Sequence, residues 1–189
     1  MSPAAYKILD NVDIKVLQDY LINHPEIFGK YDYRTVLDTS PHRDSTDIWV
    51  RYGDFDKHGL KIIPNEHDSV WFPVLLEIPT VAQIAFHLML AVHGERLGGI
   101  LITKVPPGGK IYRHTDYGWH AAYYDKYYVP VLNKKGATFS FEDGTVIDGE
   151  EGSAYWFRND IDHWVDNDTD SDRIAMIVCI KPFRGVDKE

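Results

Sequence analysis

The spacing of apolar residues predicts two helices in the first half of the chain. Positions 14, 17 and 21 carry Ile, Leu and Leu at helical spacing. Asp13 is a suitable N-cap before them and Pro25 follows them, so we predict a helix from Asp13 to Leu21. A second helix is predicted to begin at Pro79–Thr80, with apolar residues at positions 81, 84, 85, 88 and 92 on one face and Gly98–Gly99 as its stop.

The remaining pattern predicts extended structure. Residues 30–53 carry two short apolar runs, Val36–Leu37 and Ile48–Val50, on either side of a turn at Ser40–Pro41. After Gly99, short β-rich runs alternate with turn residues, including Glu142–Gly144, which predicts a hairpin. Strands this short and numerous predict an antiparallel sandwich or barrel. The predicted strands are Ile100–Lys104, Lys110–Arg113, Tyr127–Leu132, Ala137–Phe141, Thr145–Ile147, Ala154–Phe157, His163–Val165 and Arg173–Ile180.

Length and charge narrow the class of protein. The chain has 189 residues, 44% of them hydrophobic, which is enough for one sizeable core. We therefore predict an α+β, mainly β fold in one domain over residues 1–189. In it, residues 1–98 form a helical and extended support, and residues 99–182 form a β-barrel core. The formal net charge of −9 argues against binding to nucleic acids or anionic membranes.

Cysteine usage and the N-terminus predict a cytoplasmic location. The single cysteine, Cys179, excludes an internal disulfide and a cysteine-based zinc site. Its apolar neighbours in Ile174–Ile180 predict a buried, inert thiol. The first residues lack the basic start and apolar run of a signal peptide, and no apolar stretch approaches the ~20 residues that span a bilayer.

His114-Thr115-Asp116 is the strongest candidate for chemistry. On a β-strand, residues i and i+2 share a face, so His114 and Asp116 can reach one metal ion. A third ligand must come from a distant strand, and His163 follows after several short strands. Two imidazoles and one carboxylate bind one face of an octahedral metal and leave three positions open. Such a site suits Fe(II), which must bind a co-substrate and dioxygen together.

Arg173 lies ten residues after His163, beyond a polar turn. If the two flanking strands are adjacent and antiparallel, Arg173 lies beside His163 and can form a bidentate pair with the far carboxylate of an α-keto acid. Alternatively, Arg173 only neutralises the acidic turn that precedes it. The local sequence leaves both interpretations open.

Four segments together resemble the aspartyl/asparaginyl β-hydroxylase family of Fe(II)/2-oxoglutarate dioxygenases. They are Leu101–Asp116, which contains Pro-Pro-Gly-Gly and His-Thr-Asp, then Tyr128–Val131, His163–Asn167 and Arg173–Val178. The resemblance covers roughly residues 99–182. It implies a double-stranded β-helix of the jelly-roll or cupin type. Asn167, four residues after His163, belongs to the pattern and is expected to shape the turn.

The resemblance also implies roles for individual residues. His114, Asp116 and His163 would hold iron, and Arg173 would bind the distal carboxylate of 2-oxoglutarate, with Thr103 at a hydroxyl-bearing position that touches the co-substrate in relatives. With dioxygen, such enzymes hydroxylate a C–H bond and release succinate and CO₂.

This chain departs from its relatives beside the predicted site. Relatives commonly carry Arg-x-His where it has Lys126 and Tyr128, so these two residues are expected to take over co-substrate contacts. The fork geometry of arginine is lost there. Some relatives have Gly in place of the acidic ligand, whereas Asp116 completes the set here.

The substrate is expected to be a small molecule or a peptidyl side chain. Tyr117, Trp119 and His120 directly follow the first two ligands and are candidates for the substrate pocket, although they can also be ordinary packing residues. Arg51 is the candidate cation for an acidic substrate. Two other classes stay open: a cupin-like hydrolase or isomerase that uses zinc or manganese, and a non-catalytic β-barrel binding module.

Overall fold

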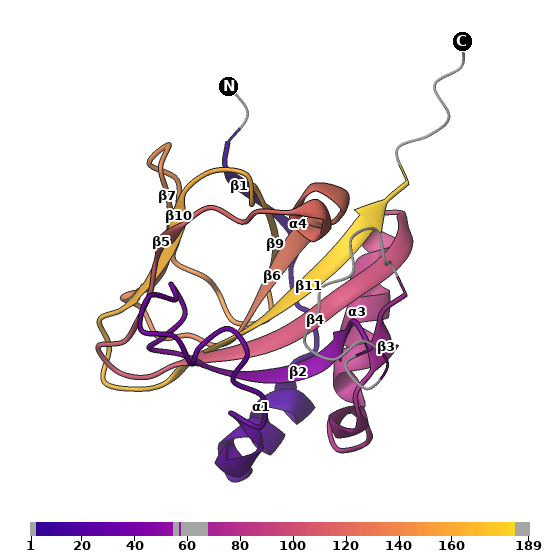
Figure 1. Ribbon diagram of the computed structural model, residues 1–189, viewed down its shortest axis with the longest axis horizontal. Coiled ribbons are helices and arrows are strands. Elements are labelled where there is room, and N and C mark those ends of the chain that lie inside the picture. Colours follow the sequence, from indigo (N-terminus) through magenta and orange to yellow (C-terminus); the bar gives the residue numbers. More distant parts are fainter. Residues whose placement is uncertain (1–2, 55–56, 58–67, 184–189) are drawn as a thin grey trace.

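Two antiparallel sheets form the centre of the molecule (Figure 1), in a computed structural model that describes residues 3–54, 57 and 68–183. The fold is mainly β, as predicted. The large sheet consists, in spatial order, of β1 (Ala5–Leu9), β9 (Ala154–Phe157), β6 (Asp125–Leu132), β11 (Arg173–Pro182), β4 (Gly94–Val105), β2 (Thr46–Tyr52) and β3 (Val70–Trp71). The small sheet consists of β5 (Lys110–His114), β10 (His163–Asn167), β7 (Ala137–Phe141) and β8 (Val146–Ile147).

Two helices cover the face of the large sheet that is turned away from the small sheet (Figure 1). They are α1 (Lys15–Asn23) and α3 (Thr80–Ala91). A short helix, α4 (Trp119–Tyr123), lies between β5 and β6, and the 3₁₀ turns η1 (Pro25–Ile27) and η2 (Pro73–Leu76) follow α1 and precede α3. Within the described ranges, every helix is too short or too polar to cross a bilayer.

Alternation along the strands separates two apolar cores. On β4, Ile100 and Ile102 face α1 and α3 and pack with Leu17 and Val81. Leu101 and Thr103, which alternate with them, face the small sheet and line a cavity there. The second core fills the space between the sheets and is rich in aromatic residues. The period-2 pattern therefore puts helices on one face of the large sheet and the cavity on the other.

The predicted strands after residue 99 are all present. β4 begins six residues earlier than predicted, at Gly94, and the other ends differ by at most two residues. The turn at Pro106–Gly109 takes the chain from β4 in the large sheet to β5 in the small one. The predicted hairpin turn at Glu142–Gly144 joins β7 to β8, and Gly144 adopts a φ of 87° there. In the described part of the chain, the strands form two sheets and do not close into one continuous barrel.

Asn167 shapes the turn between β10 and β11, as expected. Its buried side-chain amide donates to the backbone oxygens of Val105, Pro106 and Ser171, at 2.9, 3.0 and 2.9 Å. Its side-chain oxygen accepts a hydrogen bond from the Thr169 hydroxyl at 2.7 Å. One amide thus ties the end of β4 to the turn that carries the chain from the small sheet back to the large sheet.

Two predictions in the N-terminal half were wrong. Val36–Leu37 is not a strand, because both side chains are exposed and the segment forms turns. The second helix ends at Ala91, and Gly98–Gly99 lie inside β4. A Cβ on Gly98 would lie 2.8 Å from the Tyr124 ring, so this glycine permits close packing and does not stop a helix. In the C-terminal half, the short helix α4 was not predicted.

Candidate active site

The three predicted metal ligands come from two neighbouring strands of the small sheet. His163 on β10 pairs directly with His114 on β5. Asp116 follows the end of β5, where its backbone N–H donates to the Asn159 oxygen at 3.0 Å. The Thr115 hydroxyl donates to Asp162 at 2.6 Å and holds the same segment against the loop before β10. The register therefore brings together residues that are far apart in sequence.

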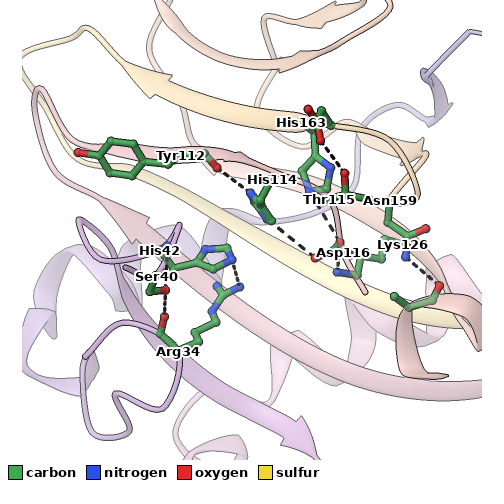
Figure 2. Close-up of polar contacts among 12 residues, drawn as sticks. Arg34, Ser40, His42, Tyr112, His114, Thr115, Asp116, Lys126, Asn159 and His163 are labelled. Carbon is green, nitrogen blue, oxygen red and sulfur yellow. Dashed lines mark hydrogen bonds and ion pairs between the residues drawn. The ribbon is translucent and has the colours of Figure 1, made fainter. Parts of the chain in front are cut away.

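The donor atoms of these residues converge on one point (Figure 2). His114 Nε2 lies 3.9 Å from Asp116 Oδ1, and His163 Nε2 lies 3.7 Å from Asp116 Oδ2. All three donors lie within 4.8 Å of one another. These distances are too long for hydrogen bonds but suit groups that share one ion. The arrangement fits a divalent metal held by two imidazoles and one carboxylate.

Both imidazoles are prepared for metal binding. The Nδ1–H of His114 donates to the Tyr112 oxygen at 2.7 Å, and that of His163 donates to the Ile161 oxygen at 2.9 Å. These bonds leave the lone pair of each Nε2 directed at Asp116. Burial lowers the pKa of His114, and it lowers the pKa of His163 to about 4. Both rings are therefore neutral near pH 7.

Arg173 lines the same cavity but reaches it from the opposite sheet. The prediction of adjacent strands was wrong, since β10 belongs to the small sheet and β11 to the large one. Arg173 pairs with Val105 on β4 and is 3% exposed. Its guanidinium lies 5.2 Å from the centre of the Tyr128 ring. Within the described ranges, Arg173 pairs with no carboxylate and its Nε lacks a hydrogen-bond partner.

Lys126 reaches the metal ligands and not Arg173. Its Nζ donates to Asp116 Oδ2 (Figure 2). On β6 it pairs with Cys179 of β11, which lies six residues beyond Arg173 along the same strand. At about 3.4 Å per residue, the backbones of Lys126 and Arg173 are thus roughly 20 Å apart along the sheet.

Thr103 belongs to a buried ionic network. Its hydroxyl donates to Asp47 Oδ1 at 2.8 Å and accepts a hydrogen bond from Arg34 at 2.7 Å. Arg34 also forms a bidentate pair with Asp47, at 2.6 and 2.7 Å. The Asp47 carboxylate is 0% exposed. Because the Thr103 hydroxyl already donates to Asp47, it has no hydrogen left for a second carboxylate.

His42 lies beside the metal ligands. Its ring centre is 4.9 Å from that of His114. Arg34 Nη1 lies 3.3 Å from His42 Nε2 and can only donate, so the ring proton of His42 sits on Nδ1. That Nδ1 is buried and has no partner among the described residues. Burial is the main cause of the lowered pKa of His42, so this ring offers a neutral N–H donor to the cavity.

A cavity of about 480 Å³ joins these groups. Tyr117, Trp119 and His120, which the sequence suggested as candidates for a substrate pocket, are among the residues that line it. Gly118 adopts a φ of 92° at the start of α4 and permits the sharp bend that turns Trp119 inward. The cavity also contains five residues from the segment 33–52 that the sequence did not single out: Tyr33, Arg34, His42, Trp49 and Tyr52.

Arg51 is not among the residues that line the cavity. A β-bulge between Trp49 and Arg51 interrupts the alternation of β2. As a result Tyr52 faces the cavity, while the Arg51 guanidinium lies 4.9 Å from the centre of the Trp71 ring. The structure therefore does not support the predicted contact between Arg51 and the substrate. The prediction assumed regular alternation along the strand, and the sequence does not reveal the bulge.

One feature of the sequence could have indicated the missed cavity residues around Arg34. Asp47 is a carboxylate in a strand whose next three residues, Ile48, Trp49 and Val50, are apolar and buried. A charge at a buried strand position needs a partner of opposite sign, which indicates a nearby cation. Nothing in the local sequence identifies that cation as Arg34, which lies in an irregular segment.

Several solved structures share this fold. A prolyl hydroxylase from Trichoplax adhaerens, in complex with a hypoxia inducible factor peptide, superposes with a TM-score of 0.61 at 12% identity, covering 95% of this chain and 84% of that one. The viral collagen prolyl hydroxylase of Paramecium Bursaria Chlorella virus-1, in complex with 2OG, gives 0.55 at 13% identity, with 97% and 98% covered.

A 2OG-Fe(II) oxygenase family protein from Burkholderia pseudomallei gives a TM-score of 0.53 at 11% identity, covering 77% of this chain and 71% of that one. At these identities the likeness establishes the fold alone, which is the expected double-stranded β-helix. No curated protein matches the sequence. The family model for aspartyl/asparaginyl β-hydroxylases matches residues 73–182, which is more than half of the chain and includes all three candidate ligands. The chain therefore belongs to the aspartyl/asparaginyl β-hydroxylase family.

Proposed function

We propose that this protein is an Fe(II)- and 2-oxoglutarate-dependent dioxygenase that hydroxylates an unactivated C–H bond of an amino acid, a peptidyl side chain or a small metabolite. The reaction converts the substrate R–H, dioxygen and 2-oxoglutarate into R–OH, succinate and CO₂. One observation carries the proposal: the cavity that contains His114, Asp116 and His163 also contains Arg173, a buried cation without a carboxylate partner in the described ranges.

The two sheets would bind different groups, the metal on the small sheet and the co-substrate's far carboxylate on the large sheet. His114, Asp116 and His163 on the small sheet would hold Fe(II), and the hydrogen bonds from both Nδ1 atoms keep the rings in the binding orientation. Bound iron supplies the activation of dioxygen and the oxidation of 2-oxoglutarate. Arg173 on the large sheet would bind the far carboxylate of the co-substrate through a charge-assisted pair. Tyr128 packs on the Arg173 guanidinium and fixes its direction.

The apolar wall limits side reactions. Phe139, Phe157 and Val165 are buried and line the cavity, where they would exclude water. The rings of Phe139 and Phe157 lie 5.7 and 5.8 Å from that of His163. We leave Thr103 out of the co-substrate contacts, since its hydroxyl donates to Asp47. A peptidyl side chain is one possible substrate, since the similar prolyl hydroxylase from Trichoplax adhaerens binds a peptide.

Succinate release tests the proposal directly. Protein supplied with Fe(II), 2-oxoglutarate and air should form succinate slowly without substrate, and His163→Ala should abolish this. A metal-dependent hydrolase or a binding module would form no succinate.

A second experiment tests Arg173. In the zinc-loaded protein, Arg173→Met should weaken 2-oxoglutarate binding by about 2–5 kcal/mol, the cost of leaving a buried charge pair incomplete. Arg158→Met, at an exposed arginine, is the matched control. Equal affinities in the two variants would contradict the assignment.

A further inference from the structure

Five aromatic side chains form a continuous row along one wall of the cavity. In order, this aromatic row consists of Tyr33, Trp49, Tyr52, His120 and Trp119. Successive ring centres lie 5.8, 5.0, 5.3 and 5.5 Å apart, which is contact distance for aromatic rings. Three of the four steps have interplanar angles of 73°, 82° and 75°, so ring faces alternate with ring edges. The proposed binding of metal and co-substrate uses none of these residues.

The sheet register places the aromatic row away from the co-substrate's far carboxylate. Arg173 pairs with Val105 of β4, whereas Trp49 pairs with Leu101, four residues earlier on the same strand. Four residues of a strand span about 13 Å. A five-carbon diacid is about as long as two extended residues, or roughly 7 Å. The row therefore borders a part of the cavity that the end of the co-substrate bound on Arg173 does not fill.

The aromatic row also adjoins the metal ligands. At one end of the row, Trp119 follows Asp116 by three residues and lines the cavity beside it. At the other end, Tyr33 precedes Arg34, whose Nη1 lies 3.3 Å from Nε2 of His42. The His42 ring packs beside the first histidine ligand (Figure 2). A group bound on the row would thus lie next to the metal.

The cavity has room for a ligand against the aromatic row. Gly99 of β4 lines the cavity, and a Cβ there would lie 2.9 Å from Cδ2 of Tyr52. Without a side chain at this position, the Tyr52 ring lies directly against the strand and leaves the space above it open. A void of roughly 150 Å³ with apolar walls holds a benzene ring. The cavity of about 480 Å³ can therefore hold one ring as well as the co-substrate.

Charge decides which kind of group the aromatic row accepts. Ring faces are electron-rich and disfavour an anion. They attract a cation, but Arg34, Lys126 and Arg173 line the same cavity. In the described part of the chain, Asp47 pairs with Arg34 and Asp116 with Lys126, while the charges of Fe(II) and the 2-oxoglutarate dianion cancel. The loaded cavity thus keeps one positive charge in excess, which opposes a further cation and favours a neutral group.

We propose that the primary substrate carries a neutral, apolar group of the size of one aromatic ring, and that the aromatic row binds this group beside the metal. The inference rests on the proposed function and names the class of substrate. The rings provide a large apolar contact area, and each is already held by its neighbours, so binding costs little conformational entropy. The C–H bond that is hydroxylated then belongs to this group or to the atoms next to it.

Benzyl alcohol is a simple probe of the aromatic row. The protein would be loaded with Zn(II), which is not redox-active, and saturated with 2-oxoglutarate, so that no turnover occurs. Titrations followed by NMR then compare benzyl alcohol with 1-propanol, which lacks the ring, and with benzylammonium, which keeps the ring and adds a positive charge. We expect benzyl alcohol to bind at least about tenfold more tightly than either, a difference of about 1.4 kcal/mol.

Variants of the row locate the bound probe. Tyr52→Gln and Trp119→Gln each replace a ring by a polar chain, so any space that they create is not apolar, and each should weaken benzyl alcohol binding about tenfold. Tyr52→Phe keeps the ring and should keep the affinity. Tyr6→Gln, at a tyrosine that is 49% exposed, is the matched control. Zinc content and 2-oxoglutarate affinity show whether each variant is folded.

Several results would overturn the inference. They are equal affinities for benzyl alcohol and 1-propanol, benzylammonium binding at least as tight as that of benzyl alcohol, or an unchanged affinity in both glutamine variants. An equal loss in Tyr52→Phe would assign the binding to the hydroxyl and not to the ring. Failure of the proposed function is separate, because it appears as failure of the wild-type protein to bind 2-oxoglutarate. Displacement of the probe by N-acetylphenylalaninamide supports a peptidyl source of the ring, and displacement by free phenylalanine alone supports an amino acid.

Discussion

Asp47→Asn should destabilise the protein strongly although the residue does not touch the metal ligands. The substitution keeps the shape of the side chain and removes its charge. Asp47 is fully buried and accepts two hydrogen bonds from Arg34 and one from Thr103. The variant leaves the Arg34 guanidinium, three-quarters buried, without its counter-ion. Removing one partner of a buried ion pair costs about 3–5 kcal/mol.

For a chain of this length, 1 kcal/mol shifts Tm by about 2–4 °C, so we expect a decrease of roughly 10 °C. Thermal and urea unfolding, followed by circular dichroism, measure this. Asp170→Asn is the matched control, since the Asp170 side chain is 85% exposed in its pair with Lys134 and should change stability by less than about 1 kcal/mol.

A double variant separates charge from packing. Arg34→Met with Asp47→Leu removes both charges and should be more stable than Asp47→Asn alone, because no unpaired ion stays buried. If Asp47→Asn is no less stable than Asp170→Asn, the network does not hold the segment around Arg34 in the way that its geometry indicates.

Three further outcomes are expected. Asn167→Ala should lower the free energy of unfolding by about 2–4 kcal/mol in urea, because three backbone carbonyls, buried or partly buried, lose their donor; an unchanged midpoint would count against this. Gly149→Ala places a Cβ 3.1 Å from the Tyr128 hydroxyl and should weaken 2-oxoglutarate binding to the zinc protein, whereas Gly53→Ala, with open space around it, should not. The metal-free protein should lose stability as the pH falls from 6.5 towards 4. In this range His163 binds a proton in the unfolded chain but stays neutral in the folded protein, where its pKa is lowered to about 4. His163→Asn should reduce that slope by up to about 1.4 kcal/mol per pH unit, and equal slopes would refute the assignment.

The sequence predicted the strands, and it predicted that the candidate metal ligands lie together, because both depend on local rules. Alternation of apolar residues marks β4 to β11, and the spacing of His114 and Asp116 follows from the two-residue period of a strand. For His163 the sequence predicted only that a distant strand carries the third ligand. In the structure that strand is β10, which pairs with β5. Arg173 was correctly expected near the site for an incorrect reason. The turn after β10 has a length that suits a hairpin, but the Asn167 amide fixes a crossing between sheets instead.

The residues that the sequence missed depend on tertiary contacts. Arg34 and His42 lie in a segment with turns and bends, where no periodicity gives the direction of a side chain. Their positions follow from Asp47, which anchors Arg34, and from Arg34, which donates to His42. Arg51 is the reverse case, a residue that was predicted to line the cavity and does not. Simple alternation predicts that it faces the cavity with Asp47 and Trp49, and a single bulge moves it out.

These differences imply that the cavity has two walls with separate physical origins. The ligand wall, formed by β5 and β10, is set by strand register, so its chemistry can be read from residue spacing. The opposite wall, around Arg34 and His42, is held by one buried ion pair. A change there alters the shape and hydrogen-bond donors of the cavity without moving a metal ligand. Substrate selection can therefore change between related chains while the spacing of the metal ligands stays the same, and the aspect of function that is hardest to predict from sequence is the one determined by tertiary contacts.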